Sequence, residues 1–364
     1  MSKNVLVIGN GYDLAHGLNT RYDDFIEYIK RAAEDDSFIE NQFSGYYLPI
    51  ENQSEREFIH KCIESNGFIG YFLDYTNAVP GWVDLERLIR EVIKYFEVFF
   101  RNHYDFIEGR NITWNLNDTE ALRGSGVRIK NCLLSFSMLY DHVNSYGPIY
   151  SKHLMEKYYS AEFGLNKREI LRILKKQLDE VIELLRIYLK NQMNEKRESI
   201  KKIRQIKEID PSYVISFNYT DTYKAYGIRP EDVLHVHGSL NKNNMVLGFN
   251  DDDPENLDFI YFKKYFQRIQ KLTGYINEGR FSYKDESGIT HRNEMAVHFY
   301  GHSMDKTDGD IILKLRSMSN RFVIYNYDQE DYEQKVVNLI EVFGKESALK
   351  EIQNGSIKFV QCRN

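Results

Sequence analysis

The sequence predicts an α/β protein with a Rossmann-like parallel sheet and a large helical insertion after the first βα unit. A β-branched apolar run over residues 4–8 ends at Gly9 and Gly11, as a buried parallel strand does when it enters a tight turn. Helical spacing dominates from about residue 35 to residue 205. After Pro211, short strand-like runs alternate with helical ones, which is typical of a parallel sheet.

The predicted elements divide the chain into three segments. Residues 1–35 form the first βα unit, in which Thr20 is suited to cap a helix whose apolar residues share one face. Residues 36–205 form the helical insertion, whose apolar stripes predict long helices over 83–106 and from 166 into the 190s. Residues 206–364 complete the sheet, with strands expected at 213–217, 233–236, 245–249, 295–300, 322–325 and 357–360 and helices at 308–318 and 332–343.

Charge and cysteine usage narrow the class of protein. The formal net charge is −6, from 48 basic and 54 acidic residues, so the basic excess of an electrostatic nucleic-acid binder is lacking. The basic residues over 190–207 alternate with Glu and predict a solvated helix face. Cys62, Cys132 and Cys362 form no C-x-x-C pair, which indicates neither a zinc ribbon nor a disulfide framework and fits a reducing compartment.

The apolar runs of the chain indicate no membrane partner. The N-terminal run is too short for a signal peptide, and no stretch of about 18 apolar residues occurs. We therefore expect a cytoplasmic protein. Its oligomeric state, including a homo-oligomer, stays open.

The first candidate site is the turn Gly9-Asn10-Gly11-Tyr12-Asp13. Because it follows a strand, its backbone N–H groups are placed to face a diphosphate at the next helix N-terminus. Leu14 stands where the dinucleotide fingerprint has its third glycine. The alternative is that the two glycines only permit a tight turn.

Two further candidates follow the ends of predicted strands, where ligands collect in open α/β sheets. The amide of Asn218 is suited to bind a ribose hydroxyl or to orient water, or else it caps the next helix. His237, followed by Gly238, is the best candidate for a proton acceptor, because imidazole titrates near neutral pH. His235 lies on the same face two residues earlier, as a core residue or a support for His237.

Acidic residues open two other predicted helices. Asp305 and Asp308 follow the strand that ends at Gly301, and either carboxylate is suited to accept hydrogen bonds from ribose or to cap the helix. Asp84 and Glu86 open the helical insertion after Trp82. Being two positions apart, they do not share a helix face, so a helix-start role is the default.

Five segments together resemble the AbiH family of bacterial phage-abortive-infection proteins. They are VIGNGYDLAHGL at 7–18, WVDLE at 82–86, FNYT at 217–220, HGSL at 237–240 and YGHSMD at 300–305. In order and spacing they cover nearly the whole chain. The first is the most specific.

The same segments are similar, more distantly, to sirtuin-like NAD-binding proteins of phage defence. That resemblance implies NAD as substrate or ligand, with Asn218 and His237 at the reacting end as catalytic residues. Gly9, Asn10, Gly11 and Asp13 would lie at the phosphate turn, and Ser303 and Asp305 beside the adenosine half. The chain lacks the zinc-binding cysteine set of a protein deacylase, and no metal is expected.

Three functions follow as hypotheses. The leading one is hydrolysis of the nicotinamide glycosidic bond of NAD, with a phage-derived activator as a partner. The second is a non-catalytic nucleotide sensor that gates a partner through the helical insertion. The third is a metal-dependent nuclease or phosphohydrolase, which would require Asp13, Asp84 and Glu86 to gather around Mg²⁺.

Overall fold

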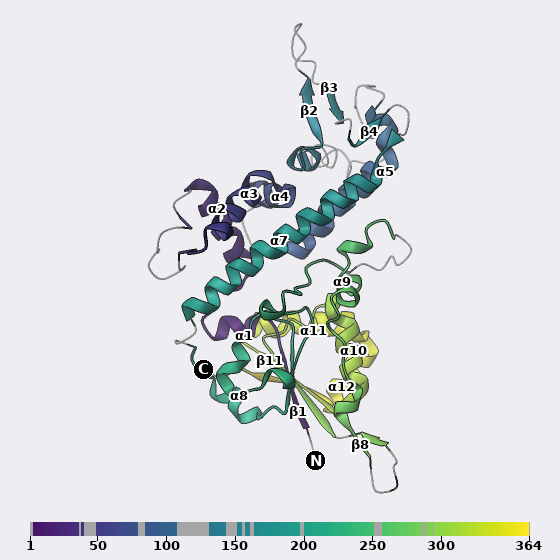
Figure 1. Cartoon of the computed structure of the whole chain (residues 1–364). Coiled ribbons are helices and arrows are strands. Elements are labelled where there is room, and N and C mark those ends of the chain that lie inside the picture. The colour runs from purple at the N-terminus through teal and green to yellow at the C-terminus, as the bar shows by residue number, and fades with distance from the viewer. Residues whose placement is uncertain are drawn as a thin grey trace. The chain divides into compact units, whose positions relative to one another are not determined.

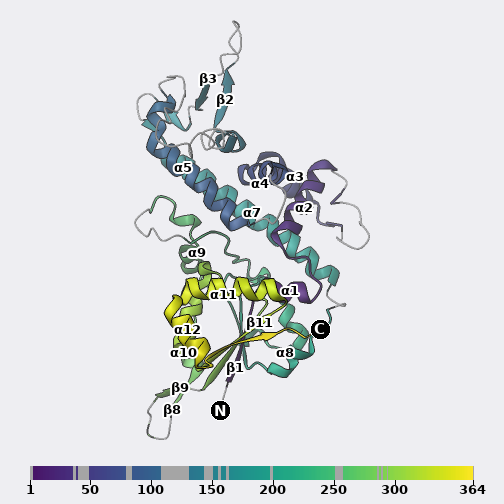
Figure 2. The same ribbon diagram turned by 180° about the vertical axis from the view of Figure 1, so that it is seen from behind.

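The computed structural model of the chain divides into two units (Figures 1 and 2). The residues that it describes are 3–35, 38–39, 49–78, 84–107, 131–142, 151–154, 157–160, 164–196, 200–250, 257–284, 287, 290–292 and 294–363. The sheet unit comprises Met1–Arg21, Leu189–Val246 and Lys264–Asn364, and the helical unit comprises Tyr22–Tyr188 and Leu247–Lys263. The predicted segment boundaries at residues 36 and 205 stay a prediction.

Among the described residues, the main sheet of the sheet unit contains six strands, all parallel, in the order β12-β11-β10-β1-β6-β7. This confirms the predicted α/β fold class with a parallel, Rossmann-like sheet. The first strand of the chain lies inside the sheet, between β10 and β6. The strands are β1 (Lys3–Ile8), β6 (Tyr213–Ser216), β7 (Val233–His235), β10 (Met295–Tyr300), β11 (Arg321–Asn326) and β12 (Ile357–Gln361).

One predicted strand is wrong. Residues 245–249 form no strand, and in this run only Phe249 makes an isolated bridge, to Lys263. Met245 and Val246 are buried, and Val246 N–H donates to the carbonyl of His237 at 2.8 Å. The apolar run therefore reflects burial of a loop, which the sequence pattern alone does not distinguish from a buried strand.

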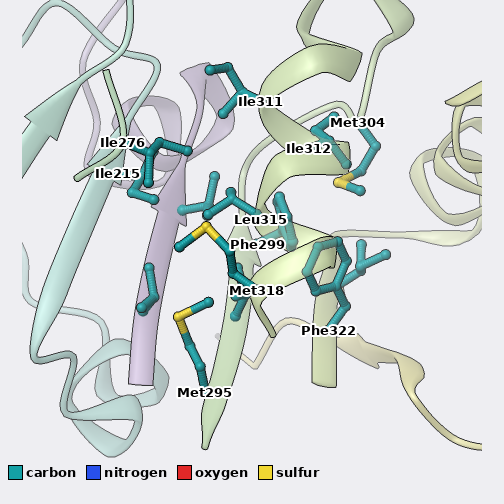
Figure 3. Close-up of a cluster of buried hydrophobic side chains, with 14 of the residues drawn as sticks. Ile215, Ile276, Met295, Phe299, Met304, Ile311, Ile312, Leu315, Met318 and Phe322 are labelled. Atoms are coloured by element: carbon teal, nitrogen blue, oxygen red, sulfur yellow. The ribbon is translucent and has the colours of Figure 1, made fainter. Parts of the chain in front are cut away.

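Alternate side chains of β1 point to opposite faces of the sheet, as the period of a strand requires. Val5 and Val7 belong to a core with the helices α10 (Gly309–Met318), α11 (Gln329–Phe343) and α12 (Lys345–Gln353). Figure 3 shows this core, where Leu315 and Ile312 from α10 approach Phe299 of β10 and Phe322 of β11. The core explains why these helices cover that face.

The other face of β1 carries Leu6 and Ile8, which belong to a second core with Ile206 and Ile209 of α8 (Arg204–Ile209). Figures 1 and 2 show α8 on the side of the sheet away from α10 and α12. The remaining elements of the sheet unit are short: α1 (Asn10–Ala15), α9 (Lys264–Gln270), the 3₁₀ turns Thr222–Tyr226, Pro230–Asp232, Leu240–Lys242, Glu278–Phe281 and Lys306–Asp308, and the hairpin β8 (Ser282–Lys284) and β9 (Thr290–Arg292).

The helical unit is built around long amphipathic helices. The apolar stripe predicted over 83–106 becomes α5 (Leu85–Ile107), and the stripe predicted from residue 166 becomes α7 (Lys167–Lys196), whose last turns belong to the sheet unit. Eight apolar residues of the α5 stripe, from Leu85 to Phe100, are buried. Its other elements are α2 (Tyr22–Glu34), α3 (Gln53–Ser65), α4 (Gly67–Ala78), the 3₁₀ turn Ile260–Phe262 and the strand pairs Leu139–His142 with Ser151–Leu154 and Tyr159–Ser160 with Gly164–Leu165.

The strand register brings four chain turns to one edge of the sheet. Ile8 at the end of β1 is paired with Tyr300 of β10 and with Ser216 of β6, and Ser216 is paired with His235 of β7. These four strands therefore end in one row. The segments that follow them contain the predicted site residues, at the edge where open α/β sheets bind ligands.

Candidate active site at the carboxyl edge of the sheet

The glycine turn after β1 packs directly against the turn after β10. Gly11 N–H donates to the carbonyl of Gly301 at 2.8 Å, and Gly9 N–H donates to the carbonyl of Tyr300 at 3.4 Å. A Cβ on Gly9 would lie 2.7 Å from the Gly301 oxygen, and one on Gly301 (φ 67°) would lie 2.0 Å from the nitrogen of Tyr12. Glycine is required because the two backbones approach so closely.

The amides of Gly9 and Gly11 therefore donate to protein carbonyls. Asn10, between them, is exposed, and its side-chain oxygen accepts a hydrogen bond from the Thr20 hydroxyl at 2.6 Å. The assignment of Gly9, Asn10 and Gly11 as cofactor contacts stays a prediction.

Asp13 on α1 is 1% exposed, and its carboxylate lies against the segment after β6. The Thr220 hydroxyl donates to Oδ2 at 2.6 Å, whereas Oδ1 has no hydrogen-bond partner among the described residues. Burial raises the pKa of Asp13 to about 6, although the hydroxyls of Thr220 and Thr222 oppose that shift. Asp13 is thus a buried carboxyl group that titrates near neutral pH.

Asn218 joins the end of β6 to the glycine turn. Its Nδ2 donates to the carbonyl of Gly9 at 2.9 Å, and the side chain is buried. The backbone of Asn218 is held by Ser216, whose hydroxyl donates to the Asn218 carbonyl at 3.0 Å. His235 Nδ1 lies 3.0 Å from the same carbonyl. Since the following 3₁₀ turn is preceded by Asp221, Asn218 is not its cap and instead positions the first turn of the site.

His237, which follows β7, lies in a buried group of ionisable side chains. Its Nε2 is 3.2 Å from Oδ1 of Asp308, outside hydrogen-bonding geometry. Lys264 Nζ lies 3.7 Å from the same oxygen, and His302 Nε2 lies 3.6 Å from Oδ2. We call these four residues the Asp308 cluster, and all four are buried.

Hydrogen bonding sets the tautomer of one imidazole in the Asp308 cluster. Nδ1 of His302 faces the backbone N–H of Met304 at 3.0 Å and accepts from it. The neutral ring of His302 consequently carries its proton on Nε2, the nitrogen that faces Asp308. Asp308 thus lies between two imidazoles and one ammonium group.

The electrostatics of the cluster favour a charged acid beside a neutral base. Burial lowers the pKa of His237, and Lys264 and Arg268 lower it further against the opposing effect of Asp308. Burial acts to raise the pKa of Asp308, but Lys264 and His237 hold it well below its usual range. An ionised carboxylate beside a neutral imidazole is the arrangement that lets a histidine act as a general base.

Phe217 connects the cluster to the glycine turn. Its ring centroid lies 5.4 Å from that of His237 and 4.2 Å from that of His302. The backbone of His302 abuts the turn, since a Cβ on Gly9 would lie 2.8 Å from the His302 Cα. His237 is therefore joined to the turn through these two side chains, at the same edge of the sheet.

The loop after β10 holds the two residues expected beside adenosine. Ser303 is exposed, and its carbonyl accepts a hydrogen bond from Asn338 at 2.8 Å. Oδ1 of Asp305 accepts from Thr307 N–H at 2.8 Å, so this carboxylate caps the 3₁₀ turn Lys306–Asp308. Of the two acids weighed from the sequence, Asp305 is the cap and Asp308 enters the buried cluster.

The other acidic motif also starts a helix. Oδ1 of Asp84 accepts from the backbone N–H groups of Glu86 and Arg87, at 3.0 and 3.1 Å. Asp84 thus caps α5, as its position suggested. Trp82 and Val83 lie outside the described residues. Within the described ranges, no group of three or more His, Cys, Asp or Glu side chains fits a metal ion, and no helix has the length and hydropathy to cross a membrane.

The comparisons with known proteins identify the family. No curated protein matches the chain. The family model described as "Bacteriophage abortive infection AbiH" matches residues 5–327, which span the chain from β1 to the end of β11 and include every site residue described above. The chain therefore belongs to the AbiH family of bacteriophage abortive infection proteins.

Proposed function

We propose that this AbiH protein binds NAD or a related nucleotide at the carboxyl edge of its sheet and hydrolyses the nicotinamide glycosidic bond. Loss of NAD would then halt an infected cell, which fits abortive infection, with a phage-derived component as activator. The observation that carries the proposal is the buried pair of His237 and Asp308, 3.2 Å apart at the end of β7.

The roles follow from the chemistry of the groups. Asp308, 3.2 Å from the ring, stabilises the imidazolium that forms when His237 takes a proton. His237 takes that proton from a water molecule while the water oxygen attacks C1′ of the ribose. The C1′–N bond breaks with its electron pair leaving on nicotinamide, through an oxocarbenium-like state. The products are ADP-ribose, nicotinamide and one proton.

Asn218 would contact the ribose of the nucleotide or the attacking water. Its Nδ2 holds the carbonyl of Gly9, so the side chain is fixed at the junction of two strand ends. An amide held in this way is suited to orient a ribose hydroxyl or the attacking water. Ser303, exposed on the loop after β10, is suited to contact the adenosine half.

One observation favours a second function, a nucleotide sensor without turnover. Asp13, Asn218 and His237 are each less than a tenth exposed, and the amides of Gly9 and Gly11 already donate to carbonyls. A nucleotide that reaches these groups has to move the turns, and such a movement is suited to signal to a partner. This function predicts saturable NAD binding without nicotinamide release.

The deciding experiment measures nicotinamide released from NAD by the purified full-length protein, with and without phage lysate. We expect release by the wild type and a loss of roughly 100-fold or more in His237→Gln, the range typical of a removed general base. His60→Gln, on α3 in the helical unit, is the matched control and should retain the wild-type rate. Thermal unfolding of each variant reports whether it is folded.

Phage protection in cells is the second measurement. If a folded His237→Gln protein releases nicotinamide and protects cells as the wild type does, the catalytic assignment is rejected. If the wild type binds NAD saturably and never releases nicotinamide under either condition, the protein is a sensor. Mutation of Asp308 to Asn should reduce the rate less than mutation of His237, because Asp308 acts through the imidazole.

A further inference from the structure

A second polar site lies on the α8 face of the sheet, away from the Asp308 cluster. It is a pocket of about 410 Å³ over β1, β10, β11 and β12, with α8 as one wall and Arg363 at its rim. No helix other than α8 lines it among the described elements. Since α8 has only six residues, it leaves this part of the sheet face open, where a doubly wound fold normally places a helix.

The pocket has an excess of positive charge. Arg321, the first residue of β11, and Arg363, just beyond β12, both line it. Neither guanidinium forms an ion pair or side-chain hydrogen bond with any part of the chain that the structure describes. The one acidic lining residue, Glu208, accepts a hydrogen bond from the exposed Arg204 at 2.9 Å. The lining therefore carries two guanidinium groups against one carboxylate.

The floor of the pocket adds a neutral hydrogen-bond donor. Nδ1 of His298 lies 3.2 Å from the Tyr325 hydroxyl, and the two rings stack with centroids 6.0 Å apart. Burial and the charge of Arg321 lower the pKa of His298 to about 4, and burial raises the pKa of Tyr325. Both rings are therefore neutral at physiological pH. In either tautomer of His298 the pair keeps one further donor, the imidazole Nε2–H or the phenol O–H.

Phosphate is the ligand that this set of groups fits best. Guanidinium groups bind phosphate oxygens through paired, charge-assisted hydrogen bonds, and the neutral donor of the His298–Tyr325 pair adds a third without electrostatic repulsion of the arginines. The pocket volume lies within the range of small-molecule sites. We propose that this pocket binds a small molecule that carries two phosphate groups, one facing Arg321 at the start of β11 and the other facing Arg363 beyond the end of β12.

Calorimetric titration of the full-length protein with inorganic pyrophosphate tests the proposal. This probe has no base or ribose, so it is not a substrate for NAD hydrolysis, and the two arginine variants distinguish binding in this pocket from binding at the glycine turn. We expect saturable binding of one pyrophosphate per chain. Arg321→Gln and Arg363→Gln should each weaken binding by roughly tenfold or more, because each removes charge-assisted hydrogen bonds.

The control is Arg172→Gln, which removes one exposed arginine charge from α7 in the helical unit and should bind as the wild type does. Thermal unfolding should be nearly unchanged in Arg321→Gln, because the side chain it replaces is exposed. The proposal is overturned if pyrophosphate does not bind the wild type, or if both pocket variants bind it as the wild type does. Citrate binding with the same affinity overturns the choice of phosphate over carboxylate.

Discussion

Asp13 is a buried acidic residue on the six-residue helix α1. Its carboxyl group is 1% exposed and accepts one hydrogen bond from Thr220. Thr220 follows Asn218, which holds the carbonyl of Gly9, so the same short segment after β6 supports both the glycine turn and the acid. Asp13 is therefore part of the framework that sets the geometry of the site.

Ionisation of Asp13 should destabilise the fold. The folded-state pKa, about 6, lies above the ordinary 3.8, so the folded protein binds this proton more tightly than the unfolded chain does. The contribution of Asp13 is then most favourable below pH 3.8 and falls as the pH rises to about 6. Above that pH the full cost, about 3 kcal/mol for a shift of this size, is present.

Asp13→Asn removes the ionisation and keeps an acceptor for Thr220. The free energy of unfolding of the variant should rise relative to the wild type as the pH increases across this window, by up to about 3 kcal/mol. Chemical denaturation at several pH values measures the difference. Asp328→Asn changes an exposed acid and should show no such trend. A difference for Asp13→Asn that stays constant with pH would contradict the assignment.

Part of the candidate site could be predicted from the sequence. A glycine turn after a strand and Asn218 after another were recognisable from position, and the structure joins them by a 2.9 Å hydrogen bond. The sequence does not indicate which of Asp305 and Asp308 caps the turn and which enters the buried cluster, because both lie where a helix begins. Lys264 gave no signal, since its partner Asp308 is distant in the chain and the two meet only when the sheet unit has folded.

At the scale of the element, a capping residue at the start of one helix can also bind a neighbouring helix, as Asn66 does. Asn66 precedes α4, and its Oδ1 accepts from the N–H groups of Phe68 and Ile69 at 3.0 and 3.2 Å. Its Nδ2 donates to the carbonyl of Gln177 on α7 at 2.8 Å. One buried side chain thus caps one helix and binds a second, both inside the helical unit.

This double role predicts a larger loss of stability than a simple cap gives. Asn52, at the start of α3, accepts only from the exposed N–H groups of Ser54 and Glu55. Asn52→Ala should lower the free energy of unfolding by about 1 kcal/mol. Asn66→Ala should cost about 1–3 kcal/mol more, because it leaves buried backbone groups without partners. Equal losses in denaturant titrations would show that the bond to Gln177 contributes nothing.

Elements with strong periodicity were predictable, and a short apolar run was not. The stripe of α5 extends over several turns, so its helical period is unambiguous. Residues 245–249 are as apolar as the strands around them, yet Val246 bonds to the His237 carbonyl and to the Tyr219 hydroxyl through its own carbonyl. The hydrogen-bond partners of Val246 are therefore a loop carbonyl and a side chain, not a neighbouring strand. The sequence does not indicate which of these partners a buried backbone group will have.

At the scale of the whole molecule, the sheet unit is assembled from three separate pieces of chain. Its first piece supplies β1, which pairs with β10 on one side and with β6 on the other. The turn after β1 then packs against the turn after β10. The site cannot form until residues near both ends of the chain have met. Alternation of strands and helices predicted the sheet, whereas the strand order became known only from the structure.

The strand order predicts a gradient of hydrogen exchange. Amides of β1 and β10 are enclosed by strands on both sides and exchange only when the centre of the sheet opens. Among the described residues, the edge strands β7 and β12 each pair with a single neighbour. Some of their backbone N–H groups therefore have no partner strand to bond to. Peptides from β1 and β10 should be the slowest to take up deuterium, followed by those of β6 and β11. Mass spectrometry after peptic digestion compares β11 with β12 as neighbours on one side of the sheet. Exchange in β1 as fast as in β12 would contradict this prediction and show that β1 is not the stable centre on which the site depends.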